Sequence, residues 1–136
     1  MDITSKNLSD KLYAEYPNLS LAWMTDDRFE IPSYEEMKRL IEINTVANIS
    51  YVSRQWACEE YALALVYKIR HWRNVCEDGT LNYVFGEVFG DKHMRKQEPH
   101  YWNIFLSDNK FYGVEPQTND IWEMSKKSDN PILIKI

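Results

Sequence analysis

The chain has 136 residues, of which 44% are hydrophobic and 14% aromatic, so it holds enough apolar side chain for one packed core and is not an intrinsically disordered protein. Its formal net charge of −5 argues against a surface that follows the phosphates of a nucleic acid. No apolar run approaches the ~18 residues of a membrane helix. Residues 1–13 lack the basic and apolar parts of a signal peptide. We therefore expect one cytoplasmic domain over residues 1–136, with neither nucleic acid nor membrane as a partner.

The first half of the chain is predicted to be helical. A short helix is expected over residues 7–15, because Pro17 follows it. The clearest signal is at Ser33, whose hydroxyl is placed to cap a helix that has Glu36 three residues later, the capping-box pattern. Apolar residues at helical spacing continue this helix as far as Ala47.

A third helix is predicted to begin at Cys58 and to end within residues 70–73. One side of it carries an apolar stripe of Cys58, Ala62, Leu65, Val66 and Ile69. Cys58 therefore faces inward in the first helical turn. A thiol at this end of a helix lies near its partial positive charge, which favours the thiolate.

Beyond Gly79 the apolar residues alternate with polar ones, which predicts strands. Five segments have this pattern: 83–90, 100–106, 110–116, 120–124 and 132–136. The predicted fold class is α+β, with N-terminal helices packed on an antiparallel sheet or half-barrel. The last segment suits either an inner strand or the edge of a homodimer.

Residues 107–110 read as a hairpin turn, and this fixes which side chains share a face of the sheet. With residues 108–109 at the tip, Trp102 lies opposite Glu115 and His100 lies opposite Gln117. All four side chains then project from one face. His100 and Glu115 become diagonal neighbours about 7–8 Å apart at the backbone, within reach of a hydrogen bond between their side chains.

Cys58, His100 and Glu115 are the components of a Cys–His–acid triad. The imidazole would take the thiol proton, and the carboxylate would fix the tautomer and orientation of the ring. Further residues are expected at the oxyanion or substrate site: Gln55, Trp56, Trp102 and Gln117.

Each of these residues also has a structural interpretation. Cys58 alone is an ordinary small core residue, His100 a hydrogen-bonded strand histidine, and Glu115 a solvated strand end. Sequence alone does not show that the helix meets this face of the sheet.

The remaining titratable residues have weaker claims to a functional role. His71 suits the end of a helix, His93 lies in a charged loop and is expected at the surface, and Cys76 is given no role. Glu87 lies between two phenylalanines on a strand face. Its carboxylate either reaches solvent or pairs with a cation or metal, because an isolated buried carboxylate is costly.

The segments WACEEYALAL, FGEVF, HYWNIFL and YGVEPQTNDIWEM together resemble the papain-like cysteine-protease domain family represented in the C-terminal half of the Marasmius oreades agglutinin. The resemblance covers about residues 50–125. It implies a papain-like fold with Cys58 as nucleophile, His100 as base and Glu115 as the orienting acid. It also implies calcium dependence, with Glu59 as the matching acidic residue. The family's sugar-binding trefoil has no counterpart here, so the resemblance implies no carbohydrate recognition.

The leading hypothesis is a thiol hydrolase, a cysteine protease or amidase acting on a peptide or protein substrate, in the host cytoplasm if the protein is phage-encoded. The alternative is a non-catalytic phage or bacterial interaction or inhibitor protein that keeps a papain-like fold, since aromatic residues dominate interface hot spots. A cell-wall amidase would use the same residues but often needs export.

Overall fold

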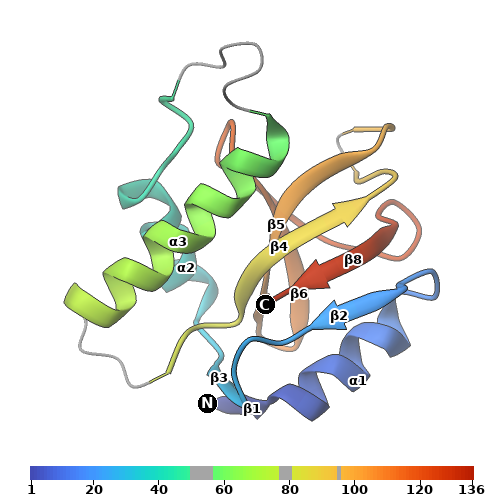
Figure 1. Cartoon of the computed structure of the whole chain (residues 1–136), viewed down its shortest axis with the longest axis horizontal. Coiled ribbons are helices and arrows are strands. Elements are labelled where there is room, and N and C mark those ends of the chain that lie inside the picture. Colours follow the sequence, from blue (N-terminus) through green and yellow to red (C-terminus); the bar gives the residue numbers. More distant parts are fainter. Residues whose placement is uncertain (50–56, 77–80, 95) are drawn as a thin grey trace.

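The computed structural model describes residues 1–49, 57–76, 81–94 and 96–136 (Figure 1). Its helices within these ranges are α1 (Ser5–Glu15), α2 (Tyr34–Ile43) and α3 (Cys58–Cys76). The large sheet contains, in spatial order, β2 (Leu21–Trp23), β8 (Pro131–Lys135), β4 (Phe85–Gly90), β5 (His100–Ser107), β6 (Lys110–Glu115) and β7 (Asp120–Glu123). A separate antiparallel pair consists of β1 (Asp2–Thr4) and β3 (Arg28–Glu30).

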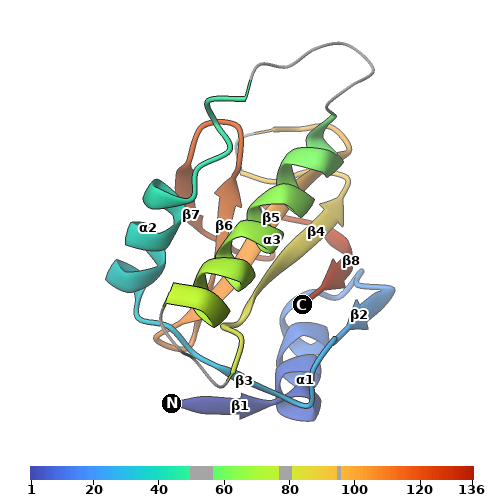
Figure 2. The ribbon, with the colours of Figure 1, turned by 60° about the vertical axis from the view of Figure 1, so that its left-hand side comes forward.

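The large sheet has helices on both faces (Figures 1 and 2). α1 packs on one face, where Leu12 joins a buried cluster with Trp102 of β5. α2 and α3 cover the other face, where Leu40 and Leu65 join a second cluster with Phe105. Because side chains alternate along a strand, the even-numbered residues of β5 face α1 and the odd-numbered ones face α2 and α3.

The helix ends are fixed by local hydrogen bonds. The Ser33 hydroxyl accepts a bond from the Glu36 amide at 3.1 Å, which confirms the predicted cap of α2. At the start of α3, the Ala57 amide donates to the Glu60 carboxylate at 2.9 Å. These bonds satisfy donors that the helices themselves leave unpaired.

The hairpin between β5 and β6 also has the predicted geometry. Asp108 and Asn109 have positive φ angles of 48° and 62°, as a two-residue turn between twisted strands requires. The predicted register holds along β5 from Ser107 to Asn103. This register places Glu115, the last residue of β6, on the same face as His100 and Trp102.

The expectation of N-terminal helices on an antiparallel sheet or half-barrel was wrong. Three strands lie within residues 1–30, and each has only 3 residues, too few for an alternating pattern to stand out. The sheet is mixed rather than antiparallel, because β2 runs parallel to β8 and joins the first part of the chain to the last. The papain-like arrangement is therefore not the one observed.

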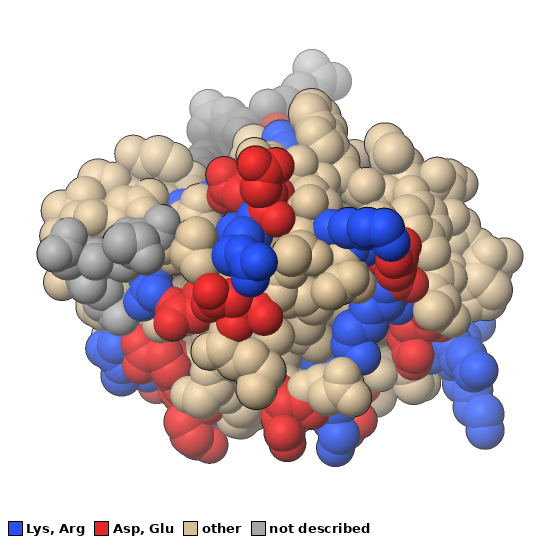
Figure 3. Space-filling model, turned by 90° about the horizontal axis from the view of Figure 1, so that it is seen from below, with Lys and Arg blue, Asp and Glu red and all other residues tan. Residues whose placement is uncertain are grey.

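On the face shown in Figure 3, acidic and basic side chains are interspersed among uncharged ones. None of the helices in the described ranges combines the length and apolar character needed to cross a membrane.

Asn103 ties α3 to the sheet. Its side chain is fully buried and its Nδ2 donates to the carbonyl of Ala62 in α3 at 2.9 Å and to that of Gly86 in β4 at 3.1 Å. These two bonds hold the first turns of the helix over the strands. The position of Glu59, one turn earlier, depends on them.

Asn103→Leu is expected to lower the free energy of unfolding by about 1–3 kcal/mol, because the two buried hydrogen bonds from the Asn103 side chain to α3 and β4 are lost. Urea denaturation followed by circular dichroism measures the change. Asn74→Leu is the control, since Asn74 is exposed near the end of α3. Equal effects of the two substitutions would contradict the role given to Asn103.

Candidate functional site

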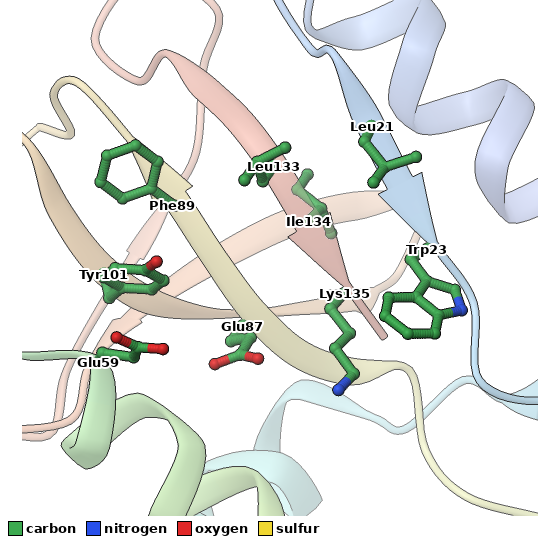
Figure 4. Close-up of a pocket in the computed structure, with 9 residues that line it drawn as sticks. All are labelled: Leu21, Trp23, Glu59, Glu87, Phe89, Tyr101, Leu133, Ile134 and Lys135. Atoms are coloured by element: carbon green, nitrogen blue, oxygen red, sulfur yellow. The ribbon is translucent and has the colours of Figure 1, made fainter.

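The face of the sheet that carries α2 and α3 is only partly covered by them. Beyond the first turn of α3 it lies open, and a hollow of about 190 Å³ lies over β2, β8, β4 and β5 (Figure 4). The strand register determines which side chains line it. They form two rows that run across the strands.

The first row is apolar. Leu21 of β2 pairs with Leu133 of β8, Leu133 with Phe89 of β4, and Phe89 with Tyr101 of β5. The rings of Phe89 and Tyr101 are in contact, with centroids 4.9 Å apart. Leu21 and Leu133 remain 51% and 41% exposed, so this row is open to a ligand.

The second row combines an aromatic ring with charges. Trp23 of β2 pairs with Lys135 of β8, and Lys135 pairs with Glu87 of β4. The ammonium of Lys135 lies 5.1 Å from the centroid of the Trp23 ring, and Trp23 is 58% exposed. Glu59 adds a second carboxylate from α3 (Figure 4). We call the two rows together with Glu59 the sheet groove.

The surroundings of Glu87 in the sheet groove change the pKa of its carboxyl group. Burial raises the pKa of Glu87, and the charge of Glu59 raises it further, while Lys135 acts in the opposite direction. Burial and the same carboxylates also raise the pKa of the Tyr101 hydroxyl, which keeps its proton. Glu87 is partly exposed in the open sheet groove, and no ion pair joins it to a cation among the described residues.

Glu59 is thus a residue of the sheet groove. The metal role expected for it is not supported by a set of ligands, because the described residues bring no third carboxylate, histidine or cysteine into its neighbourhood. Calcium prefers several oxygen ligands. Calcium binding at Glu59 remains a prediction.

The predicted contact between His100 and Glu115 is present. The Nε2 atom of His100 lies 3.1 and 3.0 Å from the two oxygens of Glu115. The histidine side chain is 3% exposed and the glutamate side chain 13%. Both belong to the face of the sheet that α1 covers, as the hairpin register requires.

Cys58 approaches His100 only at the end of the sheet, where both residues border the same hollow. It lines a hollow of about 380 Å³ together with His100 and Gln117. Cys58 begins the helix on one face of the sheet, whereas His100 projects from the other face. Within the described residues, no hydrogen bond joins the Cys58 thiol to the His100 ring.

The other predicted site residues do not lie together in the structure. Trp102 is fully buried in the cluster under α1, and it is therefore a core residue rather than a wall of the hollow beside Cys58. Gln117 lies in the turn after β6 and does line that hollow. Gln55 and Trp56 lie outside the described residues.

His93 was expected at the surface, and this was wrong. Its side chain is 1% exposed, and its ring lies 4.7 Å from Trp122, 4.9 Å from Trp102 and 5.3 Å from His100, between centroids. Burial, helped by His100, lowers the pKa of His93 to about 4. The charged residues next to His93 in the sequence are typical of an exposed loop, and no local sequence pattern indicates that its side chain is buried.

Comparisons with known proteins identify the fold but no family. No family model matches the chain, and no curated protein matches it. A solved structure described as "PSL1a-E64 complex" has a TM-score of 0.81 at 17% identity, over 99% of this chain and 51% of that one. A second structure, of Polyporus squamosus lectin bound to the epitope Neu5Aca2-6Galb1-4GlcNAc, has a TM-score of 0.78 at 16% identity, over 99% of this chain and 49% of that one.

The chain therefore shares its fold with part of a lectin chain and spans about half the length of both structures. This finding corrects the papain-like assignment. It also corrects the expectation of a cysteine protease or amidase that acts on a peptide or protein substrate, since that expectation depended on the papain-like assignment and a structure with the shared fold is described as a lectin. The alternative of a non-catalytic interaction protein agrees better with it.

Proposed function

We propose that this protein binds a neutral carbohydrate in the sheet groove without breaking any bond in it. The observation that carries the proposal is the row of apolar side chains, open to solvent, beside an exposed tryptophan and two carboxylates. Sites for small ligands are typically apolar surfaces with a few placed polar groups.

The chemistry of a sugar matches these groups. One face of a pyranose ring carries C–H groups that pack on an aromatic or aliphatic surface, here Trp23 and Leu133. Its hydroxyl groups need acceptors and donors at the edge of that surface. The carboxylates of Glu59 and Glu87 accept hydrogen bonds, and the ammonium of Lys135 donates them.

The charge of the sheet groove favours a neutral ligand. Glu59 and Glu87 are balanced there by Lys135 and by the nearby charge of Arg70, so no net charge is left to attract a sugar acid over a neutral sugar. The ligand proposed here therefore differs from the Neu5Ac-containing epitope in the lectin structure. That lectin supports the proposal only as a protein with this fold that holds a glycan.

Trp23→Ala is expected to weaken binding of a neutral glycan at least about tenfold, a loss of about 1.4 kcal/mol, because the most exposed ring of the sheet groove is removed. A glycan array on the wild-type chain identifies the ligand, and isothermal titration calorimetry measures Kd for each variant.

Tyr67→Ala is the matched control, since Tyr67 is a 67% exposed aromatic residue on α3 outside the sheet groove. It is expected to leave Kd unchanged, whereas Glu87→Gln weakens binding by removing an acceptor. Absence of any neutral glycan ligand, or equal Kd values for Trp23→Ala and the wild type, would refute the proposal.

A further inference from the structure

Three side chains that bind metals in many proteins converge on the opposite face of the sheet from the sheet groove. They are His93, from the loop after β4, His100, at the start of β5, and Glu115, at the end of β6. One nitrogen or oxygen atom from each lies within 4.8 Å of the others. No other group of this kind occurs within the described ranges.

We propose that His93, His100 and Glu115 together bind one Zn²⁺ ion. Two imidazoles and one carboxylate form a ligand set that suits zinc, which is commonly held by three protein ligands with a fourth position left for solvent. The set does not suit calcium, which prefers several oxygen ligands. This site is distinct from Glu59 and from the sheet groove.

The surrounding structure holds the three side chains in place. His93 is packed against the rings of Trp102 and Trp122, so its ring has little freedom to turn. The loop that carries it is pinned by Asp129, whose Oδ1 accepts bonds from the Met94 amide and from the Trp122 indole, both at 3.0 Å. Such outer contacts fix the orientation of metal ligands.

The protonation states also suit a cation. Burial favours the neutral form of His93, which is the form in which an imidazole binds a metal. The charged or titratable groups that face it are His100, Glu115, Asp129 and Lys96. Zn²⁺ would take the place of the direct hydrogen bond that now joins His100 to Glu115.

Solvent can reach the site from one side. His100 borders the hollow of about 380 Å³ at the end of the sheet, which is open to solvent. A water molecule there can supply the fourth ligand. The aromatic rings close the other side.

The test is zinc binding to the whole chain after removal of metals with a chelator. Calorimetric titration with ZnCl₂, and metal analysis after gel filtration, should both give one ion per chain. His93→Gln and His100→Gln are each expected to weaken binding on the order of a hundredfold. His71→Gln is the control, because His71 is exposed on α3, and it should bind as the wild type does.

A second measurement avoids any loss of folding in the variants. Co²⁺ bound to the wild-type chain should give the visible spectrum of a site with nitrogen and oxygen ligands. A thiolate charge-transfer band would assign the ion to Cys58 or Cys76 and overturn the proposal. So would the absence of stoichiometric binding, or a folded His93→Gln variant that binds zinc as tightly as the wild type. Glycan binding to Trp23→Ala reports on the sheet groove alone.

Discussion

Trp102→Ala is expected to lower the free energy of unfolding by about 3–5 kcal/mol. The indole is fully buried at the centre of the cluster between α1 and the sheet. Gly90 leaves room for it, since a Cβ atom at that position would lie 2.6 Å from the tip of the Trp102 ring. Neighbouring β4 is held in the sheet on both sides, so the cavity left by alanine cannot close easily.

Chemical denaturation of Trp102→Ala and Trp23→Ala checks this prediction. The two substitutions remove the same atoms, but Trp23 is 58% exposed and its loss should cost less than about 1 kcal/mol. Similar losses in the two variants would show that Trp102 does not have the packing described here.

Acidification from about pH 6.5 to about pH 4 is expected to remove about 3 kcal/mol of stability through His93 alone. In the folded chain the pKa of His93 is about 4, against an ordinary value of 6.5. Between these values the unfolded chain binds a proton that the folded chain does not, so stability falls as the pH falls. Above the ordinary value the contribution is complete.

The slope of stability against pH is the measurable quantity, recorded by denaturation in the presence of a chelator. His93→Gln should flatten the slope in this window even where its own stability is lower. His71→Gln should keep the slope of the wild type. A wild-type slope in His93→Gln would mean that another group titrates.

Local features of the fold could be predicted from the sequence. The cap at Ser33 and the turn at residues 108–109 depend only on neighbouring residues, and both are present. The contact between His100 and Glu115 follows from the turn, because a hairpin register transmits local geometry along two strands.

Features that depend on distant segments could not be predicted. The sheet groove is built by pairing residues 21–23 with residues 133–135, and nothing in either segment identifies the other. The site of His93 depends on a loop whose charged residues indicate a surface position, while its tryptophan neighbours come from β5 and β7. In both cases tertiary packing decides the outcome.

The place of β8 between β2 and β4 has a consequence for folding during synthesis. Residues 131–135 leave the ribosome after the other strands that the structure describes, yet they occupy an inner position of the sheet. A nascent chain can form the hairpin of β5 and β6 early. It cannot form the sheet groove until translation has passed residue 135, because β8 must pair with β2 and β4. Contacts of such high sequence separation form slowly, so the sheet groove should form later than the hairpin of β5 and β6.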